Sequence, residues 1–128
     1  MAYVLDTNVA IHLRDGDPAV TERVMALDDA VFLSIISRVE LEGGVYREPA
    51  KAGIRRARLD AMLKALSVLD FDGEAADAYR TIVEAAGYSR RKVADRMIAA
   101  QALAHRATLV TFNAADFKDV PGLTLLAW

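Results

Sequence analysis

The sequence contains no cysteine, only two histidines, and no apolar run approaching the length of a membrane span. The absence of cysteine excludes disulfides, thiolate catalysis and cysteine-based zinc sites, and it suits a reducing compartment. A spanning helix needs about 20 apolar residues, and no basic segment followed by a long apolar stretch opens the chain. We therefore expect a soluble cytoplasmic protein without a signal peptide or membrane span.

The 128 residues, 54% of them hydrophobic, are enough to bury a core, so we expect residues 1–128 to form a single domain. The net charge of −2 argues against nucleic-acid binding by bulk charge. Basic residues nevertheless gather between residues 47 and 64 and in "SRRKVADR", as solvated helix faces or as contacts to an anionic backbone. The candidates for such contacts are Arg47, Lys51, Arg55, Arg90, Arg91, Lys92 and Arg96.

Short apolar runs alternate with helical patterns along the chain. We expect strands over residues 2–5, 30–36, 66–71, 107–112 and 123–128. Helices are expected over residues 8–13, 18–27, 37–48, 51–66, 74–86 and 92–105, with an interruption near Gly43-Gly44 or Pro49. Buried strands that alternate with helices indicate an α/β fold, with a mainly parallel sheet of four to five strands flanked by helices.

Two acids follow predicted strands at the points where the strands end. Asp6 closes the first strand in "VLDTN", and Asp116 follows the fourth in "TFNAADF". Ligands of such sheets collect beyond the carboxyl ends of the strands, which makes both acids candidates for a site. Each also has a structural alternative, because Asp6 is a good helix N-cap and Asp116 suits a turn.

Two further acids lie on predicted helices. Glu40 follows Ser37 by three residues, which is the spacing of a capping box and provides a structural alternative for it. Asp95 shares a helix face with Ile98 and Ala99, on the small apolar stripe that we expect to pack on the sheet. An acid on that stripe is costly to bury without a cation or hydrogen-bond donors, so a functional interpretation is favoured for Asp95.

Four carboxylates gathered at one sheet edge would repel one another, by about 4 kcal/mol per pair at about 4 Å with an effective dielectric near 20. They would then bind protons or a cation. Oxygen ligands without cysteine or histidine favour Mg²⁺ or Mn²⁺ over zinc. Such ions polarise phosphodiesters and activate water, so the pattern points to phosphodiester hydrolysis.

Five motifs occur in order along nearly the whole chain: "VLDTN", "SRVELEGGV", "ADRMIAAQAL", "ATLVTFNAADF" and "VPGLTLLAW". Together they resemble PIN-domain ribonucleases of the VapC type, the toxin half of type II toxin–antitoxin pairs. The resemblance implies an α/β/α sandwich and a Mg²⁺-dependent endoribonuclease that cuts RNA, often transfer RNA, and inhibits translation. It also implies a homodimer and a cognate antitoxin whose C-terminal segment covers the site.

The same resemblance assigns roles to the acids. It implies that Asp6 and Asp95 bind Mg²⁺, with Mn²⁺ as a possible substitute, and that Glu40 helps to bind metal and to orient water. Asp116 matches a position that varies in the family. The implied hydrogen-bonding supports of these catalytic residues are Thr7, Asn8, Thr111 and Asn113. The alternative is a non-catalytic PIN module that binds RNA, which would be expected to have lost one or more acids, whereas all four are present.

Overall fold

A computed structural model describes all 128 residues. Its centre is a five-stranded, wholly parallel sheet with the order β3-β2-β1-β4-β5. The strands are β1 (Tyr3–Leu5), β2 (Val31–Ser34), β3 (Ser67–Leu69), β4 (Thr108–Thr111) and β5 (Thr124–Ala127). The expected parallel sheet is therefore confirmed, with strands shorter than the apolar runs that predicted them.

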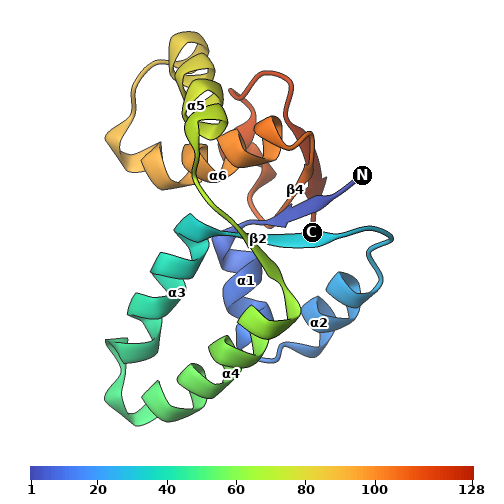
Figure 1. Cartoon of the computed structure of the whole chain (residues 1–128), viewed down its shortest axis with the longest axis vertical. Coiled ribbons are helices and arrows are strands. Elements are labelled where there is room, and N and C mark those ends of the chain that lie inside the picture. The colour runs from blue at the N-terminus through green and yellow to red at the C-terminus, as the bar shows by residue number, and fades with distance from the viewer.

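Six α-helices cover the two faces of the sheet (Figure 1). They are α1 (Thr7–Arg14), α2 (Pro18–Met25), α3 (Ile35–Arg47), α4 (Ala52–Ala65), α5 (Gly73–Ala86) and α6 (Val93–Ala104). Short 3₁₀ turns add η1 (Pro49–Lys51), η2 (Arg90–Lys92) and η3 (Ala114–Phe117). Helices α5 and α6 lie on one side of the sheet and α1 to α4 on the other, so the α/β/α sandwich is confirmed.

Alternation along the central strands explains why both faces are buried. In β1, Val4 packs in the core under α5 and α6, whereas Leu5 packs under α1 and α2. In β4, Leu109 and Val110 divide between the same two cores, and all four side chains are completely buried. A strand that needs apolar residues on both faces reads as a continuous apolar run, as the sequence does.

The start of α3 differs from the prediction. The predicted strand 30–36 ends at Ser34, which is the N-cap of α3 and accepts the N–H of Ile36 at 3.0 Å. The helix therefore begins before Ser37, and the predicted capping box between Ser37 and Glu40 is wrong. Ser37 is instead completely buried inside the first turns of α3.

The predicted interruption at Gly43-Gly44 is also wrong, because α3 continues through both glycines to Arg47. Leu41 and Val45 on the same helix are buried in the core with α1 and α4. This packing outweighs the poor helix propensity of the glycine pair. The alternative break is correct, because the chain leaves the helix before Pro49.

The strand order reverses between β1 and β4. The chain passes from β1 to β2 and β3 on one side, and then returns to β4 and β5 on the other. Ligands of open α/β sheets bind where the strand order reverses in this way. None of the helices combines the length and the apolar character needed to cross a lipid bilayer.

Candidate active site

Asp6 follows β1 directly and is only 4% exposed. One carboxylate oxygen, Oδ1, accepts the N–H of Thr7 at 2.9 Å, so Asp6 does cap α1. The other oxygen, Oδ2, accepts the hydroxyl of Thr111 at 2.8 Å, from the end of the neighbouring strand β4. The capping role therefore accounts for only one carboxylate oxygen, and Thr111 of β4 holds the other.

Glu40 is joined to the same centre through the hydroxyl of Thr7. Thr7 Oγ1 donates to Glu40 Oε1 at 3.0 Å and lies 2.8 Å from the hydroxyl of Ser37. Since the Thr7 proton goes to Glu40, Ser37 is the donor to Thr7. A chain of hydroxyls thus links α1 to α3 and holds the exposed carboxylate of Glu40 beside the end of β1.

Asp95 lies in the first turn of α6 and is partly buried. Its carboxylate makes no hydrogen bond and no ion pair within the chain. Together with Asp116 of η3, which is exposed, it lines a hollow of about 280 Å³ whose other walls are Arg91 and Lys92. Two acids from different segments therefore face the same cavity as two basic residues.

Burial and mutual repulsion raise the pKa of two of these carboxyls. Desolvation is the main cause for Asp6, and the negative charges of Glu40 and Asp116 add to it, against the hydrogen bonds from Thr111 and Thr7. Desolvation also raises the pKa of Asp95, followed by repulsion from Asp6 and Asp116, with Lys92 opposing. The four acids thus interact electrostatically, and the protein compensates the negative charge of Asp6 and Asp95 only in part.

The donor set is suited to a hard divalent cation, although no three acidic or imidazole side chains lie close enough together to enclose an ion. Mg²⁺ is commonly bound by one or two carboxylates and completes its coordination with water and substrate phosphate. Asp6 and Asp95 could supply such a pair. Burial and repulsion raise the pKa of both carboxyls, and a bound cation would stabilise their charged forms.

The predicted hydrogen-bonding residues divide into two groups. Thr7 and Thr111 contact the acids directly, as described. Asn113 contributes only its backbone N–H, which donates to Thr111 Oγ1 at 3.0 Å, and the exposed side chain of Asn8 contacts none of the acids. Sequence reasoning missed the contribution of Ser37, although a hydroxyl one helical turn before Glu40 was the available signal.

The predicted contacts to an RNA backbone also divide. Arg47, Arg90 and Arg91 are exposed and make no ion pair. Three others already have acidic partners: Lys51 and Arg55 pair with Glu48, and Lys92 pairs with Asp119, at distances of 3.1–3.5 Å.

Arg96 is only 4% exposed and donates to Gly87 O at 2.6 Å and to Asp119 Oδ2 at 3.0 Å. A buried guanidinium whose Nη1 and Nη2 are already hydrogen-bonded cannot reach a phosphate at the surface. The structure therefore contradicts the predicted RNA contact at Arg96, which instead ties α6 to the end of α5 and to the segment after η3.

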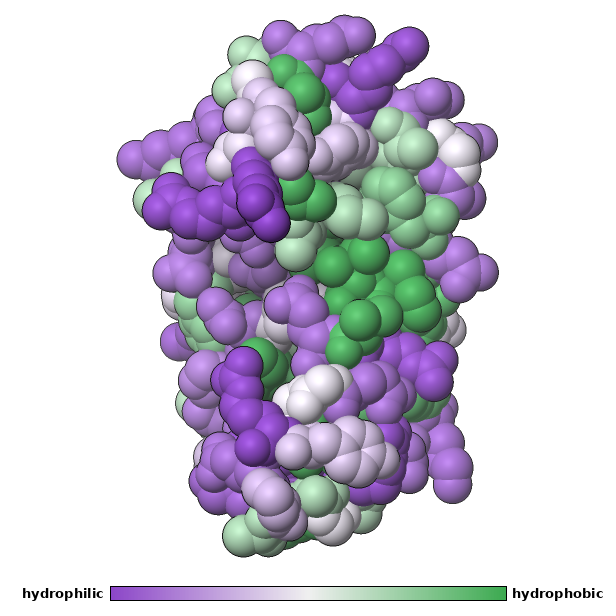
Figure 2. Space-filling model, turned by 90° about the vertical axis from the view of Figure 1, so that its left-hand side faces the viewer, coloured by the Kyte–Doolittle hydropathy of each residue, from purple (hydrophilic) through white to green (hydrophobic).

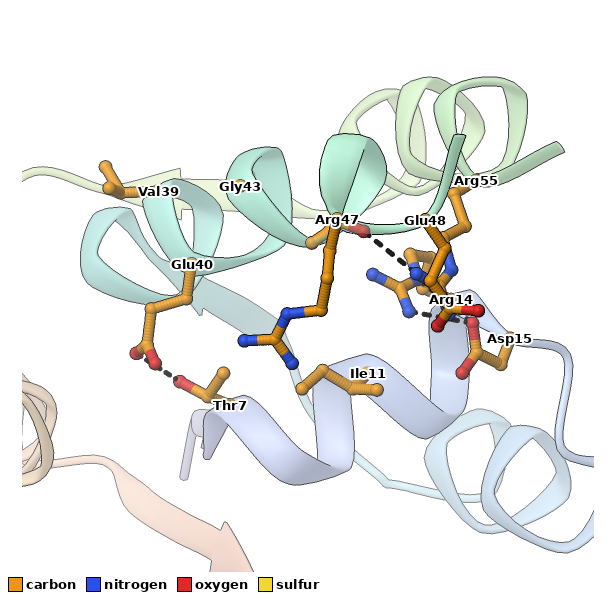
Figure 3. A pocket seen from close by; sticks show the side chains of 11 residues that line it. Thr7, Ile11, Arg14, Asp15, Val39, Glu40, Gly43, Arg47, Glu48 and Arg55 are labelled. Atoms are coloured by element: carbon orange, nitrogen blue, oxygen red, sulfur yellow. Dashed lines mark hydrogen bonds and ion pairs between the residues drawn. The ribbon is translucent and has the colours of Figure 1, made fainter. Parts of the chain in front are cut away.

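A larger hollow of about 490 Å³ continues from Glu40 along the groove between α1 and α3 (Figure 3). Nine of the 11 residues that line it are not hydrophobic, and they include three arginines. Figure 3 shows the side chain of Arg47 entering this hollow between Glu40 and Arg14. The geometry therefore joins an acidic centre to an elongated, polar groove.

Comparison with known proteins identifies the family. The PIN domain family matches residues 3–123. The chain belongs to the PIN-domain family. It is 32% identical to Ribonuclease VapC2 of Rickettsia felis, over all of this chain and 98% of that protein. The predicted resemblance to VapC-type PIN domains is thereby confirmed.

Solved structures with the same fold come from toxin–antitoxin complexes. VapBC2 of Rickettsia felis, bound to a DNA fragment from its promoter, matches this PIN domain with a TM-score of 0.87 and 30% identity over all of this chain and 99% of the other. DNA-bound VapBC of Salmonella typhimurium matches with a TM-score of 0.85 and 25% identity, over 100% and 98% of the two chains.

Proposed function

We propose that the chain is a divalent-metal-dependent endoribonuclease that serves as the toxin of a toxin–antitoxin pair. The observation that carries this proposal is the pair of acids Asp6 and Asp95, both with raised pKa and neither with a cationic partner in contact. They lie where the strand order reverses, in a PIN domain similar to a protein named as a ribonuclease. A nuclease centre accounts for these unpaired acids.

In this proposal Asp6 and Asp95 hold Mg²⁺, which Mn²⁺ can replace, with Glu40 and Asp116 beside them. When bound, the cation supplies Lewis-acid polarisation of the phosphodiester and a lower pKa for water. The protein's own contribution is to fix the acids. Thr111 and the backbone of Thr7 hold both oxygens of Asp6, so its carboxylate does not need to reorient during the reaction.

The proposed reaction is hydrolysis of the RNA backbone. Glu40, held by Thr7, accepts a hydrogen bond from the attacking water and orients it. A new bond forms from water oxygen to phosphorus as the bond from phosphorus to the 3′-oxygen breaks. The water gives up one proton and the 3′-oxygen takes up one from solvent, leaving a 5′-phosphate and a 3′-hydroxyl. Arg91 and Lys92 line the hollow with Asp95, and in this proposal they bind the remaining phosphate oxygens.

Carboxylate-to-amide substitutions test the proposal. Asp6→Asn and Asp95→Asn keep side-chain size while removing a charge, and each should lower RNA cleavage at least about 100-fold because the cation loses a ligand. Asp77→Asn, an exposed position on α5, is the matched control and should cleave normally. Mapping RNA 5′-ends after brief expression of each variant measures cleavage and also identifies the RNA cut, which we propose to be transfer RNA or another structured RNA.

Two outcomes would contradict the proposal. Wild-type cleavage by Asp6→Asn with Mg²⁺ would show that this pair is not the metal site. Binding of RNA without cleavage in either Mg²⁺ or Mn²⁺ would instead support a non-catalytic PIN module.

We further propose a cytoplasmic complex with a cognate antitoxin, as in the VapBC assemblies that this fold matches. A small reading frame next to this one, with a product that co-purifies with the chain, is the observation that checks it. A homodimer is also proposed, since α3 exposes Val39 and Tyr46 and its side of the molecule carries an apolar area (Figure 2). Light scattering of the purified protein measures that state.

A further inference from the structure

The groove between α1 and α3 is walled on one side by a single face of α3. Glu40, Gly43, Gly44 and Arg47 share that face, because they are separated by three and four residues. The face therefore presents an acid at one end, bare helix backbone in the middle and a base at the other end. Glu40 and Arg47 are about 10 Å apart along the helix axis.

The two glycines of this face differ in what they do for the folded chain. A Cβ on Gly44 would lie 3.2 Å from Nη1 of Arg14, so the absence of a side chain there makes room for that guanidinium. A Cβ on Gly43 would meet nothing within 4 Å. Packing does not explain Gly43, although a glycine inside a helix is less favourable than alanine.

Two of the three arginines in the groove already have acidic partners. Arg14, whose side chain is 4% exposed, pairs with Asp15 at 2.9 Å, and Arg55 pairs with Glu48 at 3.1 Å. Arg47 has no partner, and its guanidinium lies inside the hollow (Figure 3). The groove thus holds one unpaired cation, about two helical turns from Glu40.

We propose that this groove holds the ribose–phosphate backbone of single-stranded RNA beside the bond that is cut. Arg47 binds a flanking phosphate, and Gly43 leaves the surface of α3 bare so that the strand can lie against it. This inference rests on the proposed ribonuclease function. A polyanion suits the groove better than an amphipathic helix, which needs an apolar surface, because only two of the 11 lining residues are hydrophobic.

Four variants test the groove, two of them as controls, with wild type as reference. Binding of a short fluorescent single-stranded oligoribonucleotide of mixed sequence is followed by anisotropy, in EDTA so that it is not cut. Arg47→Ala should weaken binding about ten-fold at low salt and lower the slope of log affinity against log salt by about 0.7, the value for one lost phosphate contact. Lys64→Ala, which removes an exposed base outside the groove, is the charge control and should bind as wild type.

Gly43→Ala separates binding from folding. Better helix propensity should raise its Tm by about 2–4 °C, while the added methyl should weaken RNA binding several-fold without changing the salt slope. Gly53→Ala is the matched control, because this exposed helical glycine also has nothing within 4 Å and lines no groove. It should gain stability and bind RNA normally.

Three other outcomes would overturn the inference. If Arg47→Ala and Gly43→Ala bind the oligonucleotide like wild type, the groove does not hold RNA although the chain does. If wild type itself binds no RNA, the proposed function fails together with the inference. If Arg47→Ala retains RNA binding and loses only the co-purified antitoxin, the occupant of the groove is an acidic peptide.

Discussion

At the scale of single residues, Asp95 combines a cost to folding with its proposed function. Folding raises the pKa of its carboxyl. The free energy of unfolding therefore falls as the pH rises from the pKa of the unfolded chain to that of the folded one, and it stays lower at neutral pH. The contact of the Thr111 hydroxyl with Asp6 and that of the Thr7 hydroxyl with Glu40 followed from the motifs, because hydroxyls beside these acids have few other partners. The roles of Ser37 and Arg96 did not, since they depend on which elements pack against them.

Asp95→Asn should therefore stabilise the protein in the absence of metal. Removing a partly desolvated charge should raise the free energy of unfolding at pH 7 by about 0.5–1 kcal/mol, after allowance for solvent screening. Thermal unfolding in EDTA should show a higher Tm for this variant and an unchanged Tm for Asp77→Asn. An unchanged or lower Tm for Asp95→Asn would mean that its carboxylate is not under electrostatic stress.

At the scale of elements, Arg96 links α6, which carries Asp95, to the segment that follows Asp116. It lies next to Asp95 on α6 and binds Asp119, three residues after Asp116. Although desolvation opposes it, the hydrogen bond from Arg96, together with Lys92, holds the pKa of Asp119 below its ordinary value. The buried contact between Arg96 and Asp119 was not predictable from "SRRKVADR", in which Arg96 resembles its exposed neighbours.

Arg96→Ala should lower the free energy of unfolding by about 2–3 kcal/mol, because it removes two hydrogen bonds of a buried cation. Its Nε has no partner, which keeps the expected loss below that of a fully satisfied guanidinium. Arg96→Lys should recover part of the loss by keeping the contact to Asp119. Urea denaturation measures both variants, and a wild-type midpoint for Arg96→Ala would refute the structural assignment.

At the scale of the whole molecule, the sequence predicted the class of sheet because buried parallel strands read as apolar runs. It also placed the apolar stripe of α6 correctly, since Ile98, Ala99 and Ala102 are all fully buried. The order of the strands could not be derived from local patterns, because it depends on how the helices pack. That order brings the end of β4 against Asp6, and so it determines which acids meet.

Calorimetric titration of Mn²⁺ or Mg²⁺ into the antitoxin-free protein measures whether Asp6 and Asp95 bind a cation. We expect saturable binding that Asp95→Asn abolishes and that Asp77→Asn preserves. Burial raises the pKa of both Asp6 and Asp95, so protons should compete with the cation for these carboxylates. As the pH is lowered, the affinity for the cation should therefore begin to fall at a higher pH than it would for ordinary aspartates. Equal binding by wild type and Asp95→Asn, or no binding by either, would show that these acids are not a metal site.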